Sequence, residues 1–243
     1  MALVTTAAFA QTEHLELLQS KFWSGGFDVY SNGWKANFKH GSVFHSTSRH
    51  YYEIEIASVH HPKEYRQTQD FGWTVPGIPP PKPFVFGKQN SFMNFNLSYG
   101  IYKQLGEKAQ KSGVSIGFNS SVGLSLGITK PYYLWLLFPL DDTTSVLRMV
   151  KYSEENKNIF LDNFSIYGGG GFKEGITELK FIPGAHLKAA LDFDWASYNE
   201  YIKSIEIGVS LDAYYKKIPI MILENNIQFF PALYCGFVFG KKW

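Results

Sequence analysis

Histidine is the residue type whose spacing in this sequence first suggests chemistry. His40, His45 and His50 recur at intervals of five, and His60-His61 follows shortly afterwards. Metal sites need imidazoles that converge at defined spacing, and a five-residue interval along a turn does not supply such a cage. We therefore interpret these histidines as polar turn and interface residues, and we expect neither a metal nor a cofactor.

A run of four glycines at residues 168–171 is the second candidate motif. A phosphate-binding loop would continue with Gly-Lys-Ser/Thr, and this run does not. We interpret it as a flexible loop hinge, because glycine adopts unusual backbone conformations at little cost. Nucleophilic or acid–base catalysis would need a paired nucleophile and base, and the sequence pairs no particular serine with a particular histidine. No catalytic residue is assigned.

Charged and amide side chains recur at every second position within several apolar runs. In residues 49–59, Glu53 and Glu55 alternate with Ile54 and Ile56. Period two indicates a β-strand, whose successive side chains point to opposite faces. We predict that one face lines a polar barrel interior, where opposite charges neutralise one another. The residues assigned to this interior are Glu53, Glu55, Asn94, Asn96, His186, Lys188, Asp192, Asp194, Glu206 and Asp212.

Alternating runs recur along the chain, most of them near the ~9–11 residues of a tilted membrane-spanning strand. The first two flank Asn32-Gly33, a strong hairpin signal. The predicted strands cover residues 22–30, 34–39, 49–59, 92–104, 114–128, 185–196, 205–215 and 227–240. Their even number returns the carboxyl end to the side on which the first strand starts. The sequence therefore predicts an all-β fold, an antiparallel eight-stranded transmembrane β-barrel.

The connections between the predicted strands alternate in length. Short polar links occur at residues 40–48, 106–113 and 197–203, and long segments at residues 60–90, 139–180 and 216–226. Outer-membrane barrels combine short periplasmic turns with long outer loops, so we assign the long segments to the outside. The first of them contains the Pro-rich residues 76–83, which should be stiff and polyproline-like.

Two apolar stretches outside the predicted strands are candidates for contacts with lipid or a partner. Residues 218–223 form an apolar loop tip, which would lie on lipid, fold over the mouth of the barrel or meet another protein. Residues 132–138 would either extend the fifth strand beyond the bilayer or form a contact ledge. The residues assigned to these contacts are Trp135, Ile218, Ile220, Met221 and Ile222.

The start of the sequence resembles the end of a secretory signal peptide. Residues 1–10 carry an Ala-x-Ala pattern that places the cleavage after Ala10, although no basic region precedes it. We interpret these residues as a signal-peptide remnant. Residues 11–22 are expected to form a periplasmic segment or a short amphipathic helix, and residues 23–243 the barrel.

Composition limits the partners. The chain has 23 basic and 21 acidic residues, and the basic residues are dispersed along it. We therefore expect no nucleic-acid partner. Aromatic residues make up 17% of the sequence, which suits the girdles of a membrane barrel. Because an eight-stranded barrel is filled by its own side chains, general porin activity is not expected. A water-soluble sandwich or lipocalin-like barrel shares the alternation and stays an alternative.

Seven stretches of the sequence carry a resemblance. They read Ser-Asn-Gly-Trp (31–34), Phe-Lys-His-Gly (38–41), His-Pro-Lys-Glu (61–64), Phe-Gly-Lys-Gln-Asn (86–90), Thr-Lys-Pro-Tyr-Tyr-Leu (129–134), Lys-Ile-Pro-Ile-Met (217–221) and Phe-Gly-Lys-Lys-Trp (239–243). As a set they resemble a family of small bacterial outer-membrane β-barrel proteins of unassigned activity, over nearly the whole chain from about Gly25. The resemblance implies a fold and a location, and it carries no known catalytic residue.

These observations predict a non-enzymatic barrel of the cell outer membrane, acting as a structural or accessory subunit. Its partners would be outer-membrane lipid and other outer-membrane proteins, met through the loops at residues 60–90, 139–180 and 216–226, since binding surfaces often lie in loops. One alternative is a lipid-modifying outer-membrane enzyme that catalyses acyl transfer or hydrolysis. The other is a ligand-binding or narrow-pore barrel lined by Glu53, Glu55, Lys188, Asp192 and Asp194.

Overall fold

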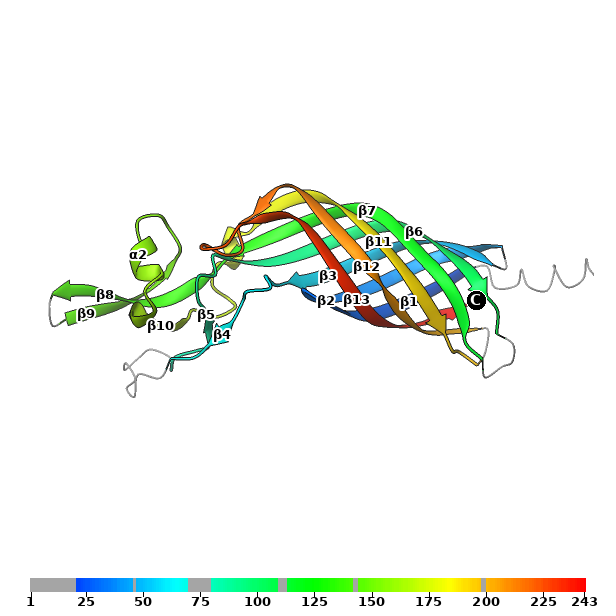
Figure 1. Cartoon of the computed structure of the whole chain (residues 1–243), viewed down its shortest axis with the longest axis horizontal. Coiled ribbons are helices and arrows are strands. Elements are labelled where there is room, and N and C mark those ends of the chain that lie inside the picture. Colours follow the sequence, from blue (N-terminus) through cyan, green and yellow to red (C-terminus); the bar gives the residue numbers. More distant parts are fainter. Residues whose placement is uncertain (1–20, 46, 70–79, 109–112, 142–143, 198–199) are drawn as a thin grey trace, which may run out of the picture.

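The barrel dominates the structure, a computed structural model that describes residues 21–45, 47–69, 80–108, 113–141, 144–197 and 200–243 (Figure 1). Eight antiparallel strands close into a ring in which β1 pairs with β13 and every other neighbour follows the chain order. The barrel strands are β1 (Lys21–Tyr30), β2 (Gly33–His45), β3 (Ser48–Val59), β6 (Asn90–Gly106), β7 (Ser115–Pro131), β11 (Lys180–Asp194), β12 (Tyr201–Ile218) and β13 (Ile227–Lys242). The predicted eight-stranded barrel is confirmed.

The two ends of the barrel sequence meet at the seam. Val29 stands opposite Cys235 and Phe27 opposite Phe237, so β1 and β13 align along nearly their full lengths. At the rim, the backbone N–H of Lys21 donates to the carbonyl of Trp243 at 3.0 Å, and the reverse bond has the same length. Closure leaves no unpaired barrel edge. The predicted signal remnant at residues 1–10 lies outside the described residues, and of residues 11–22 only Lys21 and Phe22 are described, at the start of β1.

The outer wall of the barrel is apolar around its circumference. Alternation along each strand turns large hydrophobic side chains outward, and Leu124 on β7 is the most exposed example on the wall, at 72%. Exposed Trp23, Trp195 and Trp243 lie at the end that holds the carboxyl terminus: Trp23 stands opposite Lys241, and the Trp195 N–H donates to the carbonyl of Lys203. Other outward residues include Phe27, Phe38, Ile54, Ile56, Leu97, Phe118, Val122, Leu187, Ile207, Val209, Leu233 and Phe237. Such a wall suits a lipid environment.

The barrel interior is layered. An apolar cluster that contains Phe92, Tyr214 and Phe230 fills the outer end. A second cluster, with Tyr51 and Tyr102, fills the opposite end. Tyr51 lies across Gly100 on the next strand, and Tyr102 lies across Gly117, at positions where a Cβ atom would overlap the ring. These strand glycines therefore make room for large interior rings.

A folded outer region extends from the end of the barrel opposite to the carboxyl terminus (Figure 1). β8 (Tyr133–Asp141) begins directly after β7 and forms a three-stranded sheet in the order β10-β8-β9. The remaining elements are β9 (Thr144–Lys151), α2 (Lys157–Phe160), η1 (Asn163–Ser165), β10 (Ile166–Gly169), η2 (Ile176–Glu178), and the pair β4 (Arg66–Gln67) and β5 (Phe84–Val85). The described part of residues 139–180, expected to be a loop, thus belongs largely to a small structured unit, which we call the outer arm (the described residues between 133 and 178). No helix in the described part of the chain is long and apolar enough to span a membrane.

The glycine run belongs to this arm and corrects our hinge interpretation. A Cβ atom on Gly168 would lie 2.9 Å from the backbone nitrogen of Lys82, and one on Gly169 would lie 2.9 Å from the carbonyl oxygen of Pro83. The Gly169 N–H donates to the Lys82 carbonyl at 3.1 Å. The described end of the Pro-rich segment therefore packs directly on β10, and the glycines permit that close approach rather than flexibility.

Candidate functional site

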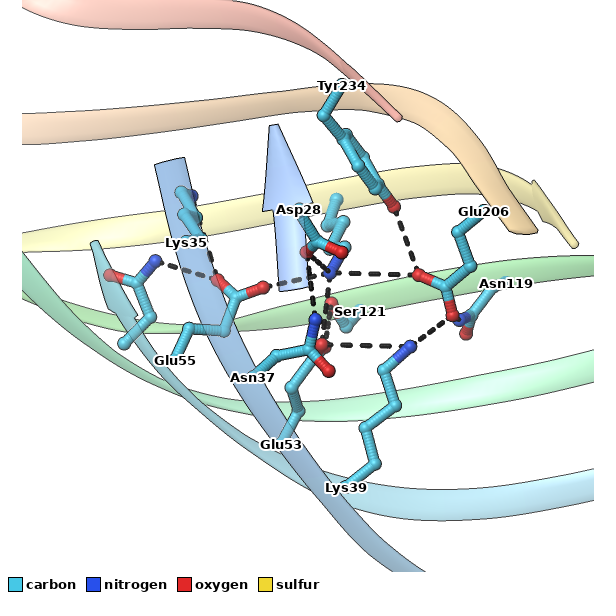
Figure 2. A network of polar contacts seen from close by, with 12 residues as sticks. Asp28, Lys35, Asn37, Lys39, Glu53, Glu55, Asn119, Ser121, Glu206 and Tyr234 are labelled. Carbon is cyan, nitrogen blue, oxygen red and sulfur yellow. Dashed lines mark hydrogen bonds and ion pairs between the residues drawn. The ribbon is translucent and has the colours of Figure 1, made fainter. Parts of the chain in front are cut away.

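Ion pairs occupy the middle of the barrel (Figure 2). The ammonium nitrogen Nζ of Lys188 on β11 lies 2.9 Å from Glu55 Oε1 and 3.0 Å from Glu53 Oε1. It also lies 3.5 Å from Asp28 Oδ2 and 3.9 Å from Glu206 Oε2. These five side chains come from β1, β3, β11 and β12, so one cation links strands from different sides of the barrel.

Two lysines of β2 complete the pairing of the acids. Lys35 Nζ lies 3.3 Å from Asp212 Oδ2 and 3.7 Å from Glu55 Oε2. Lys39 is paired with Glu206 and lies 3.8 Å from Glu53 Oε1. Each carboxylate of this central network thus has at least one ammonium group nearby, as buried charges require.

His186 is a buried histidine of the barrel interior. Its Nδ1 lies 2.6 Å from Asp212 Oδ1, and its Nε2 lies 3.1 Å from Glu55 Oε2. Asn96 donates to the same Glu55 oxygen at 3.0 Å. The imidazole is 0% exposed, so this cluster of histidine and carboxylates is closed to solvent. It holds β3, β11 and β12 together.

All the residues that the sequence assigned to the interior are buried there. Most belong to the central network, and Asp194 instead lies toward the end that holds the carboxyl terminus, with its Oδ1 3.5 Å from Lys108 Nζ. Asp192 lines a small cavity beside Glu206. Asn94 is buried two positions before Asn96 on β6.

Several members of the network were missed in the sequence. Asp28, Lys35, Lys39 and Asn119 are buried, and Asn119 Nδ2 donates to Glu206 Oε1 at 2.9 Å. Lys35 and Lys39 alternate with Trp34, Ala36 and Phe38, so the period-two rule applied within residues 34–39 would have found them.

The apolar loop tip covers the mouth of the barrel. Ile218, Ile220 and Met221 are buried in the apolar cluster at the outer end. We call this segment the lid. The Gln89 N–H donates to the Ile220 carbonyl at 2.8 Å, which joins the lid to the turn between β5 and β6. The sequence left three placements open for this segment: on lipid, over the mouth of the barrel, or against another protein. In the structure it lies over the mouth. The assignment of these three residues to a lipid or partner contact is therefore corrected.

The other two residues assigned to contacts lie in the outer region. Trp135 and Ile222 are half-buried, Trp135 on β8 as an extension of the fifth strand and Ile222 against the apolar cluster of the arm. A buried ion pair between Lys88 Nζ and Glu64 Oε2, 2.6 Å apart, ties the loops around the mouth together. Three of the stretches that carry the family resemblance, residues 61–64, 86–90 and 217–221, thus meet at the mouth.

The histidines singled out by spacing are dispersed. His40 lies at the rim, with its ring 6.2 Å from that of Trp243, whereas His50 Nδ1 lies 2.6 Å from the Tyr99 hydroxyl. His61 Nδ1 accepts a hydrogen bond from the Lys63 backbone at 3.2 Å. Across the described ranges, no group of three or more histidine, cysteine or acidic side chains is arranged to hold a metal ion.

These features define a class: a closed eight-stranded β-barrel with an apolar wall, an ion-paired interior and a folded outer arm. No protein-family model matches the chain. No curated protein sequence matches it.

Solved structures of small barrels are similar in shape. Neisserial surface protein A has 6% sequence identity and a TM-score of 0.41, with 92% of this chain and 96% of that chain covered. Ail, the attachment invasion locus protein of Yersinia pestis, has 8% identity and a TM-score of 0.39, with 93% and 98% covered. The N-terminal barrel domain of Pseudomonas aeruginosa OprF has 8% identity and a TM-score of 0.37, with 93% and 98% covered. Likeness at this level assigns no activity or partner to the chain.

Proposed function

We propose that this protein is a non-enzymatic integral barrel of a bacterial outer membrane, which anchors its outer arm for contact with a partner protein. The observation that carries the proposal is the continuous apolar wall around a closed and filled interior. Water cannot solvate such a wall at low cost, whereas lipid can. The fold thus supports a membrane anchor.

The interior supports anchoring rather than transport. Apolar clusters fill both ends of the barrel, the ion-paired network lies between them, and the lid of Ile218, Ile220 and Met221 covers the mouth. A conducting pore would need a continuous polar path instead. The side chains that the pore alternative requires, such as Lys188 and Glu55, are paired with one another.

The outer arm supports a docking role because it is folded. Leu134 and Leu136 of β8 pack with Phe160 and Ile166 of the arm and with Phe84 of β5 in one apolar cluster. Lys151 of β9 and the Tyr133 hydroxyl of β8 both donate hydrogen bonds to Glu178 of η2, which joins these elements of the arm. The same two bonds lower the pKa of the Glu178 carboxyl. A platform that is already ordered loses little entropy when a partner binds.

Exposed hydrophobic side chains on the arm identify the surface to test. Phe164 is 82% exposed and Phe172 is 73% exposed. Purification of the tagged protein from gently solubilised membranes should bring a stoichiometric partner, and the double change Phe164→Ser and Phe172→Ser should release it. Leu105→Ser, at an exposed position in the carboxyl-terminal half of β6, is the matched control and should retain the partner. A wild-type protein that purifies as a clean monomer would contradict the docking role.

A further inference from the structure

A groove with a volume of about 440 Å³ lies on the outer surface beside the lid. Four separate parts of the chain form it: residues 63–67, which end in β4, the turn after β5, the η1 helix, and residues 221–224. The volume is within the ~300–1,000 Å³ of typical small-molecule sites.

The groove is apolar at its base and preformed. Phe86, Met221 and Leu223 supply apolar lining, and Gly87 has a φ of +67°, a conformation that favours glycine. The Ile222 N–H donates to the Gly87 carbonyl at 2.8 Å, which joins residues 221–224 to the turn after β5. The buried Lys88–Glu64 ion pair adds a second connection.

Polar groups line the groove as donor–acceptor pairs. Lys63 Nζ lies 2.8 Å from Glu224 Oε2. Gln67 Nε2 donates to Asn163 Oδ1 at 3.0 Å. Each pair places hydrogen-bond donors next to acceptors, and the charges of the first pair cancel.

This chemistry fits hydroxyl groups. A hydroxyl both donates and accepts, so it can bridge either pair, whereas an anion would have to compete with Glu224 for Lys63. A sugar ring also has an apolar face, which suits the apolar base and the Tyr65 ring, 78% exposed at the edge of the groove. We propose that the groove binds a neutral oligosaccharide, with Tyr65 packing on a sugar ring and the Gln67–Asn163 and Lys63–Glu224 pairs bonding to its hydroxyls.

The inference is independent of the proposed anchor, because it is tested on the purified full-length protein in detergent. An array of immobilised neutral, sialylated and sulfated oligosaccharides serves as the probe. The wild type should be retained by neutral oligosaccharides, and Tyr65→Ala and Gln67→Ala should each weaken retention about tenfold. Tyr215→Ala, which removes an exposed ring outside the groove, should bind like the wild type. Unchanged electrophoretic mobility of the unboiled variants shows that they are folded.

A second part of the experiment distinguishes two sources of the sugar. Polysaccharide purified from the surface of the producing bacterium is immobilised beside the array. Retention on this polysaccharide assigns the groove to the cell's own coat, and retention on array sugars alone assigns it to foreign glycans. Failure to retain any neutral oligosaccharide, preference for the sulfated or sialylated ones, or equal retention of Tyr65→Ala and the wild type would each overturn the proposal.

Discussion

Replacement of Lys188 by methionine is expected to lower the free energy of unfolding of the barrel by about 3–5 kcal/mol. Methionine has a similar length but no charge, so Asp28 would lose its ammonium partner. Of their ammonium contacts, Glu53 and Glu55 would keep only the longer ones, to Lys39 and Lys35. Carboxylates that lose their partner in a closed interior keep the cost of desolvation without the attraction that offset it. Urea unfolding of the protein in lipid vesicles, followed by the loss of the fast-migrating unboiled band, measures the change.

The control for this variant is Lys173→Met, at an exposed position of the outer arm, which should change stability by less than ~0.5 kcal/mol. The double variant Lys188→Met with Glu55→Gln should lose less than the sum of the single changes, because it removes a charge together with its partner. If Lys188→Met unfolded at the same urea concentration as the wild type, the central network would not stabilise the barrel.

A second large effect is expected on the outer wall. Val122 stands in the middle of the outward-facing run of β7, opposite Tyr99 and Leu187, both of which also face outward. Val122→Arg should destabilise the barrel in vesicles by about 2–4 kcal/mol, because the guanidinium would enter the centre of the bilayer.

The same substitution near the end of the strand provides the matched control. Ile116→Arg, beside the start of β7, should cost only about 0–1 kcal/mol, since arginine is tolerated at the membrane interface. A barrel whose wall faces water would tolerate arginine at either depth. Equal unfolding free energies for the two variants would therefore contradict the membrane-spanning interpretation.

Period two explains why much of the barrel could be predicted. An interior face is predicted at Glu53, Glu55 and Lys188, because each stands between apolar neighbours on a strand. The ends of the strands were harder to predict from the sequence. β11 begins at Lys180 rather than Ala185, because its backbone continues to pair with β7 through Pro183 and Gly184, two residue types that disfavour strands.

The outer region was harder to predict because its structure depends on contacts between distant residues. The glycine run is locally consistent with a hinge, and only the approach of Lys82 and Pro83 shows that it is a packing surface. Likewise, the apolar sequence of the lid permitted three placements. Its hydrogen bonds to residues 87 and 89, more than a hundred positions earlier, place it over the mouth.

Cys235 allows the most direct test of the central claim, because the sequence has 1 cysteine and it is exposed on the outer wall in β13. In washed bacterial membranes, a charged, membrane-impermeant maleimide should fail to label Cys235 until the protein is denatured, since lipid would cover the thiol. A cysteine introduced at an exposed position of the arm by Glu155→Cys should label at once and serves as the positive control. Labelling of native Cys235 as fast as this control would mean that the apolar wall faces water and that the protein is not a membrane-spanning barrel.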